Sequence, residues 1–255
     1  MTDTAIPDPG SGPQKDAELV QRMFDRVAPR YDLANTLLAL GQDRHWRRVA
    51  ARALAPRPGQ KMLDVAAGTG MLAHELRSYG ADVVALDFSA NMLRAGADRE
   101  ARGRTPAGTG PHPSDGLRWC TGDGTRLPFG DGTFDGVTIA FGLRNLPDVD
   151  AGLAEFSRVL RPGGQLLVLE FSRPTWATLR FLYQRGALAA MPLAARICTS
   201  DPRAYRYLAE SIVAWPDQRR LAAMIAGHRF AQIRWKNLSG GIVAAHHAIR
   251  TTSSH

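Results

Sequence analysis

Short apolar stretches alternate with longer amphipathic ones through the middle of the chain. Stretches rich in valine, leucine or isoleucine predict strands at 61–66, 82–87, 117–121, 134–140 and 165–170. Between most of them, apolar residues recur at helical spacing. This alternation predicts a wound α/β fold with a parallel sheet.

The chain before the first predicted strand has a different pattern. From residue 16 to residue 54 apolar positions recur every three or four residues and are interrupted by Pro29 and Gly41, which predicts two or three helices. We describe 16–58 as an N-terminal helical cap. Residues 1–15 hold Pro, Gly, Ser and Asp without periodicity and predict a flexible tail.

The last third of the chain departs from simple alternation. Helical patterns cover 176–190 and 201–213, and a third helix is expected to begin at Pro216 and Asp217. Strands at 230–238 and 242–250 flank a Ser-Gly-Gly turn and predict an antiparallel hairpin. A parallel sheet finished by such a hairpin resembles the Rossmann-like, seven-stranded class I fold of S-adenosylmethionine-dependent methyltransferases.

Length and composition fit one globular domain after the tail. The chain has 255 residues, of which 44% are hydrophobic, which excludes a disordered or fibrous protein. We expect a single domain over 16–255. After the cap, a cofactor-binding core spans 59–170 and includes a mobile loop at 101–116. Helices that face substrate or membrane span 171–229, and the terminal hairpin spans 230–250.

The sequence has neither a candidate membrane-spanning segment nor a secretory signal, which bears on where the protein is expected to reside. No uncharged stretch reaches the ~18 apolar residues of a spanning helix, and the first residues do not form a secretory signal. The two cysteines, Cys120 and Cys198, have neither disulfide-framework nor zinc spacing. We therefore expect a cytoplasmic protein without a metal.

A glycine-rich turn follows the first predicted strand. Gly68 and Gly70 lack the Cβ atoms that would keep a ligand away from the turn. The same residues also satisfy the dinucleotide fingerprint G-x-G-x-x-A, so the turn alone allows NAD. Asp87, at the end of the next strand, could accept the ribose hydroxyls of either ligand. Asp64 favours S-adenosylmethionine, because a carboxylate beneath the turn can hold an ammonium group but would repel a pyrophosphate.

A third polar segment follows the third predicted strand. Asp123 is placed there to accept the exocyclic amine of an adenine, and Gly122 and Gly124 would allow close approach. The alternative is that these two glycines only form tight turns. Because the carboxyl ends of parallel strands share one edge of a sheet, these segments predict a binding crevice at that edge.

Longer segments are similar to those of one enzyme family. They are 27–35 with Trp46, 140–145, 158–172, and 205–211 with 216–218. On these segments the chain resembles the ubiquinone/menaquinone biosynthesis C-methyltransferases. The resemblance implies S-adenosylmethionine as cofactor, with Thr69, Asp87, Asp123 and Gly124 at cofactor positions. Ala140 departs from the pattern, because many members have a serine there that contacts the cofactor.

The resemblance also implies a reaction. It is methylation of a ring carbon of a polyprenylated quinol, with conversion of demethylmenaquinol to menaquinol preferred and the ubiquinone-pathway benzoquinol as the alternative. The excess of arginine over lysine resembles actinobacterial members, which favours menaquinone. A nicotinamide-dependent oxidoreductase and an RNA-modifying enzyme are the other classes considered; only the net charge of +8 suggests the latter.

Carbon methylation needs a nucleophilic ring carbon, which a hydroquinone acquires as a phenolic proton leaves. A cation or a base is therefore expected at the ring oxygen. Arg144 could stabilise the phenolate and Asn145 could orient it, because both follow the fourth strand at the crevice edge. Tyr31 and Asp32 could close over the ring from the cap. Asp32, or Glu170 at the end of the fifth strand, could relay the proton.

The expected partners follow from the substrate and from one basic segment. Residues 173–206 combine six arginines and one acid with large apolar side chains. Such a segment can lie on an anionic membrane and accept a prenyl tail, and the alternative is that it packs as an ordinary part of the fold. We expect a polyprenylated quinol as substrate and peripheral contact with the cytoplasmic membrane, with a homodimer as a further option. We expect no nucleic-acid partner, because aromatic stacking positions are not evident.

Overall fold

The computed structural model describes residues 41–103, 117–183 and 202–252. Several predictions lie outside these residues: the tail at 1–15, the cap up to residue 40, nearly all of the loop at 101–116, and the helical pattern beyond residue 183. Candidate residues Tyr31 and Asp32 belong to this group.

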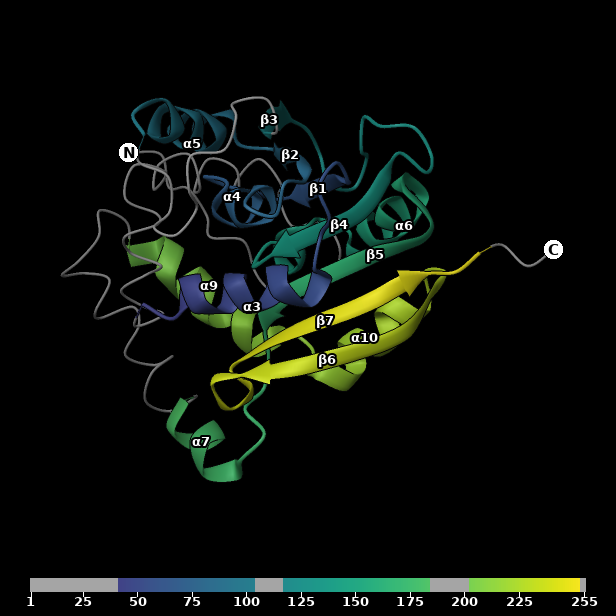
Figure 1. Cartoon of the computed structure of the whole chain (residues 1–255). Helices are drawn as coiled ribbons and strands as arrows, with labels where there is room; N and C mark the ends of the chain where they lie inside the picture. Colours follow the sequence, from purple (N-terminus) through teal and green to yellow (C-terminus); the bar gives the residue numbers. More distant parts are fainter. Residues whose placement is uncertain (1–40, 104–116, 184–201, 253–255) are drawn as a thin grey trace.

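The predicted sheet is present and has seven strands in the order β3-β2-β1-β4-β5-β7-β6 (Figure 1). Five of them pair in parallel, and β7 is antiparallel to both of its neighbours, β5 and β6. The class I methyltransferase arrangement is therefore confirmed. The strands are β1 Lys61–Val65, β2 Asp82–Asp87, β3 Leu117–Thr121, β4 Phe134–Ala140, β5 Leu160–Phe171, β6 Phe230–Leu238 and β7 Val243–Arg250.

One strand begins earlier than its hydrophobic pattern suggested. The prediction started β5 at Gln165, whereas Leu160 already pairs with Phe134 and is fully buried. A register irregularity separates this pair from the rest of the ladder, where the exposed Arg161, Pro162 and Gly163 lie. Because these three residues are polar or disfavoured in strands, the hydrophobic pattern does not indicate that the strand begins before them.

The helices begin at residues that suit helix starts. Ser89, Asp148 and Asp217 each accept a hydrogen bond from a backbone N–H of the first turn, which satisfies one of its otherwise unpaired donors. The expected start at Asp217 is therefore confirmed. The helices are α3 Asp43–Leu54, α4 Met71–Arg77, α5 Ala90–Ala101, α6 Val149–Val159, α7 Ala177–Leu182, α9 Pro202–Ala214 and α10 Gln218–Ala226, with short 3-10 turns η2 Leu143–Asn145 and η4 Ser239–Gly241.

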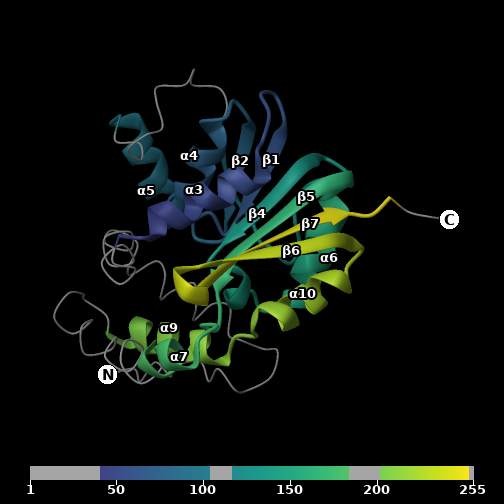
Figure 2. The same cartoon turned by 60° about the horizontal axis from the view of Figure 1, so that its bottom comes forward.

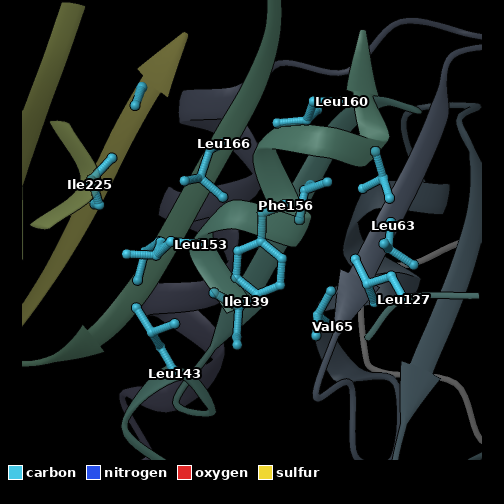
Figure 3. Packing of buried hydrophobic residues seen from close by; sticks show 14 of the residues in the cluster. Leu63, Val65, Leu127, Ile139, Leu143, Leu153, Phe156, Leu160, Leu166 and Ile225 are labelled. Atoms are coloured by element: carbon cyan, nitrogen blue, oxygen red, sulfur yellow. The ribbon is translucent and has the colours of Figure 1, made fainter. Parts of the chain in front are cut away.

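Helices cover both faces of the sheet (Figure 2). Alternate residues of the central strands point to opposite sides, so in β5 Leu166 and Val168 belong to one core cluster and Leu167 and Leu169 to the other. The first cluster packs under α6 and α10, around Phe156 (Figure 3). The second packs under α3 and α4. This double cover leaves the carboxyl ends of the strands to form a site.

Candidate functional site

The carboxyl ends of three neighbouring strands carry the predicted cofactor residues. Val65 near the end of β1 is in register with Leu86 on β2 and with Ile139 on β4. The segments that follow these strands therefore lie at one edge of the sheet. The three strand ends that the sequence predicted to meet, those near Asp64, Asp87 and Asp123, belong to the adjacent strands β1, β2 and β3, and Ala140 ends β4 on the other side of β1.

Asp87 connects two of these segments. Its Oδ2 accepts a hydrogen bond from Gly68 N–H at 2.7 Å, and its Oδ1 accepts one from Ser89 N–H at 2.9 Å. The carboxylate is 5% exposed. Asp87 thus fixes the glycine turn after β1 relative to the beginning of α5, in addition to any hydroxyl that it accepts from a ligand.

The two glycines of the turn have backbone conformations that favour glycine. Gly68 has φ 58° and Gly70 has φ 75°. A Cβ on Gly70 would lie 2.5 Å from the Trp119 ring, and the same ring would meet a Cβ on Gly96 at 2.6 Å. The absence of a Cβ at Gly70 therefore allows the Trp119 side chain of β3 to pack against the turn, in addition to allowing a ligand to approach it. The sequence analysis missed Trp119, whose fit depends on two glycines distant in the chain.

Asp64 is a buried carboxylate with one oxygen unsatisfied. It is 1% exposed, its Oδ1 accepts a hydrogen bond from Thr138 Oγ1 at 2.7 Å, and its Oδ2 has no hydrogen-bond partner among the described residues. Burial raises the pKa of Asp64 to about 7, although the Thr138 hydrogen bond and the charge of Arg47 oppose this shift. An acceptor oxygen buried beneath the turn fits a ligand ammonium group.

Asp123 and Gly124 have local structural roles in the turn after β3. Asp123 is exposed, and its Oδ1 accepts hydrogen bonds from both the N–H and the Oγ1 of Thr125 at 2.8 Å. A Cβ on Gly124 would come within 3.0 Å of both Val65 and Leu146. Close packing therefore explains the glycine at this position. Thr69, by contrast, is 3% exposed and lies within the cofactor turn itself.

Arg144 and Glu170 form a buried ion pair beside the end of β4. Arg144 Nη1 lies 2.7 Å from Glu170 Oε1, and it also donates to the carbonyl of Phe141 at 2.7 Å. Arg144 Nε donates to Ser211 Oγ on α9 at 3.4 Å. The sequence placed Arg144 at the crevice edge, but it is only 3% exposed. Two residues proposed separately for the substrate site are therefore direct partners.

Aromatic side chains connect α3 to this ion pair through ring contacts. Phe141 lies 6.0 Å from Trp46 on α3 and 5.0 Å from Phe171, measured between ring centroids. The guanidinium groups of Arg47 and Arg144 lie 5.3 Å and 5.2 Å from the ring centres of Phe141 and Phe171. Phe141 has φ 60°, a conformation that bulky residues rarely adopt. The sequence analysis did not predict this aromatic wall.

Two more polar atoms near Arg144 are buried and unpaired within the described residues. The Oδ1 atom of Asn145 and the hydroxyl of Tyr207 on α9 have no hydrogen-bond partner among the described residues. Asn145 is the last residue of η2, and Asp148 is the N-cap of α6. Tyr207 was not singled out from the sequence, although it belongs to a segment that carries the family resemblance.

The three described ranges contain no group of three or more His, Cys, Asp or Glu that could hold a metal ion. In the same ranges, no helix has the length and hydrophobicity needed to cross a membrane.

Comparison with known proteins identifies relatives over nearly the whole chain. The profile of the ubiE/COQ5 methyltransferase family matches residues 12–250. The demethylmenaquinone methyltransferase of Mycolicibacterium paratuberculosis is 53% identical and aligns over 91% of this chain and 94% of its own. That of Mycobacterium tuberculosis strain H37Rv is 52% identical, over 91% and 92%.

A solved structure supports the fold. Haemonchus contortus phosphoethanolamine N-methyltransferase 2, solved with S-adenosyl-L-methionine, aligns with a TM-score of 0.57 over 81% of this chain and 52% of its own, at 16% sequence identity. At that identity the likeness concerns the fold, and the reaction must be argued from the site.

Proposed function

The chain belongs to the ubiE/COQ5 methyltransferase family, and we propose that it transfers a methyl group from S-adenosylmethionine to a ring carbon of demethylmenaquinol. This is the final step of menaquinone biosynthesis. The 53% identity to a demethylmenaquinone methyltransferase, over nearly all of both chains, is the observation that carries the substrate assignment.

The methyl-donor site is supported by the residues at the carboxyl ends of β1 and β2. The unsatisfied Oδ2 of Asp64 is suited to the donor's ammonium group. Asp87 is suited to the ribose hydroxyls, since its carboxylate ends β2 and is held beside the glycine turn by the N–H groups of Gly68 and Ser89. We assign Asp123 to the adenine amine and Thr69, Gly70 and Ala140 to the cofactor wall.

The substrate site is supported by the ion pair and the aromatic wall. When bound, S-adenosylmethionine supplies a methyl group: the S–CH₃ bond breaks as a bond to the ring carbon forms, and one proton is released. Arg144 is assigned to the developing phenolate and Asn145 to its orientation. The aromatic rings of Phe141 and Phe171 offer an apolar surface for a flat ring system. Tyr31 is assigned to closure over the ring.

The proton relay is better assigned to Asp32 than to Glu170. Glu170 Oε1 accepts hydrogen bonds from Arg144 Nη1 and Phe171 N–H, and Oε2 lies 3.5 Å from Arg144 N–H, so protonation would neutralise the carboxylate and weaken its pairing with Arg144. Glu170 is also fully buried in its side chain. We therefore assign Glu170 to positioning Arg144.

Methyl transfer can be measured directly. The protein is incubated with isotopically labelled S-adenosylmethionine and a short-chain demethylmenaquinone, either reduced with dithionite or left oxidised. Label is expected in the extracted quinone only from the reduced substrate. Preferential methylation of the ubiquinone-pathway benzoquinol would assign the chain to the other pathway. Binding of NADH in place of S-adenosylmethionine, measured by calorimetry, would reject the function.

Peripheral membrane binding would give the enzyme access to a polyprenylated substrate. Trp176, just before α7, is 73% exposed, and Phe181 on α7 is 62% exposed. This helix lies apart from the sheet in Figure 1. Arg173 and Arg180 are exposed in the same segment. Exposed aromatic rings beside arginines suit an anionic lipid surface, and we propose that this segment contacts the membrane.

A homodimer is a further proposal about assembly. The edge strand β6 is exposed from Arg234 to Asn237, so it offers backbone groups to which a second copy could pair. Sedimentation velocity tests this proposal: a mass of one chain across micromolar concentrations would reject it.

A further inference from the structure

The hydroxyl of Tyr207 is a buried donor for which the described part of the chain provides no acceptor. Tyr207 is 2% exposed, and its Oη has no hydrogen-bond partner among the residues that the structure describes. Buried polar groups in native proteins are nearly always paired, so an unpaired one calls for an explanation. The ring could pack equally well without its oxygen, as phenylalanine does, so packing alone does not explain the hydroxyl.

The position of Tyr207 on α9 associates it with the ion pair. Ser211 lies four residues later on α9, and therefore one turn along the same face. Its Oγ accepts the hydrogen bond from Arg144 Nε. The face of α9 that carries Tyr207 is thus the face turned toward Arg144, beside the substrate site proposed above.

A neutral hydroxyl donor would complement Arg144 at an oxygen that becomes negative. The charge of Arg144 is already offset by Glu170 at 2.7 Å. Burial raises the pKa of Tyr207, an effect that Arg144 opposes. Tyr207 therefore keeps its proton at neutral pH and is a hydrogen-bond donor there. The Oδ1 atom of Asn145, the residue after Arg144, is an acceptor that likewise has no partner in the described ranges, so the surroundings of Arg144 offer both kinds of group to a phenolic ligand.

We propose that the Tyr207 hydroxyl donates a hydrogen bond to a ring oxygen of the bound quinol, beside Arg144. The bond strengthens as the oxygen loses its proton, so it stabilises the transition state for methylation more than it stabilises bound substrate. Tyr207 is then a catalytic residue that touches the substrate. This inference rests on the proposed function and deepens it.

The test compares Tyr207→Phe with Tyr79→Phe. Tyr79 precedes β2, at the opposite edge of the sheet from the site, and its substitution is the same chemical change. Single-turnover methylation of the reduced short-chain substrate is measured at saturating donor. We expect Tyr207→Phe to slow it about 10²-fold, the loss typical of one donor to a developing oxyanion, whereas Tyr79→Phe retains the wild-type rate.

Two measurements separate this role from a structural one. Donor affinity by calorimetry should be unchanged in Tyr207→Phe, and its thermal midpoint should equal or exceed that of the wild type, because the substitution removes an unsatisfied buried group. A second series uses hydroquinones with more acidic phenols, for which the rate loss should shrink. Equal rates for Tyr207→Phe and the wild type would overturn the proposal, as would a rate loss accompanied by a lower midpoint. Failure of the wild type to methylate any reduced quinol would instead reject the proposed function.

Discussion

Arg144 on η2 and Glu170 near the end of β5 lie 2.7 Å apart, with side chains that are 3% and 0% exposed. The pair joins two adjacent strands of the sheet and connects them to α9 through Ser211. A charge this deeply buried depends on its partner, since an unpaired one would cost several kcal/mol in desolvation. Any substitution at Arg144 therefore tests both the fold and the chemistry.

The first prediction separates the effect on stability from the effect on catalysis. It removes the charge of Arg144 alone and then together with that of Glu170. Arg144→Met leaves Glu170 unpaired and should destabilise the protein by roughly 3–5 kcal/mol. Combining it with Glu170→Met should restore most of the unfolding free energy, since hydrophobic replacement of a whole buried pair is often neutral. Turnover should remain at least ~10²-fold low in both variants, as expected when a charge is lost at the substrate oxygen. Urea unfolding and single-turnover rates check this; recovery of turnover in the double variant would give Arg144 a purely structural role.

The second prediction concerns Asp87. Asp87→Ala removes the acceptor for Gly68 and Ser89 N–H and the proposed acceptor for the ribose, so affinity for S-adenosylmethionine should fall. A loss of ~1.5–3 kcal/mol for hydrogen bonds to a charged group corresponds to about 10- to 100-fold. Calorimetry of the folded variant measures it. Asp82→Ala, at the exposed beginning of the same strand, is the control and should bind normally; equal affinities would remove Asp87 from the site.

Most of the fold could be predicted from the hydrophobic pattern. Strand positions were recognisable because buried parallel strands are continuous apolar runs, and the Ser-Gly-Gly turn between β6 and β7 indicated the hairpin. The beginning of β5 was not recognisable, because Pro162 and Gly163 stand where its ladder is irregular. The pairing of Leu160 with Phe134 of β4, on the far side of these residues, depends on a contact with another strand and is not visible in the local sequence.

The site was predictable where its residues follow strands and less so where it depends on contacts across the fold. Asp64 and Asp87 were singled out from their positions near the ends of the first two strands, around a glycine turn. The partnership of Arg144 with Glu170 and the fit of Trp119 against Gly70 depend on tertiary contacts between distant segments. Tyr207 lay in a recognised segment, but only the structure reveals that its hydroxyl has no partner.

The third prediction follows from the raised pKa of Asp64. Burial raises this pKa from 3.8 to about 7 in the folded protein, so the folded state holds the proton more tightly than the unfolded state. Tighter proton binding by Asp64 therefore adds to the free energy of unfolding. This contribution is complete below pH 3.8 and is lost as the pH rises to about 7, a loss on the order of 4 kcal/mol. Affinity for the donor should increase over the upper part of this range, because the ammonium group binds ionised Asp64.

Asp64→Asn tests this assignment. The amide keeps an oxygen for the Thr138 hydrogen bond but cannot ionise, so at pH 8 the donor-free variant should be more stable than the wild type. Its affinity for S-adenosylmethionine should be lower and nearly independent of pH between 6 and 8. Chemical unfolding and calorimetry at several pH values measure both properties. An Asp64→Asn variant that keeps the wild-type pH dependence of donor binding would exclude Asp64 as the titrating group.

The last prediction concerns the membrane. If the segment around α7 contacts lipid, the protein should sediment with vesicles containing phosphatidylglycerol more than with neutral vesicles, and salt should weaken the binding by screening the arginines. Trp176→Ala and Phe181→Ala should each reduce partitioning about 10-fold or more, since burying a large apolar side chain contributes roughly 1.5–3 kcal/mol. Trp235→Ala is the matched control, because Trp235 is also exposed, at 40%, but lies on β6. Equal partitioning of all three variants and the wild type, or equal binding to both vesicle types at low salt, would reject membrane contact through this segment.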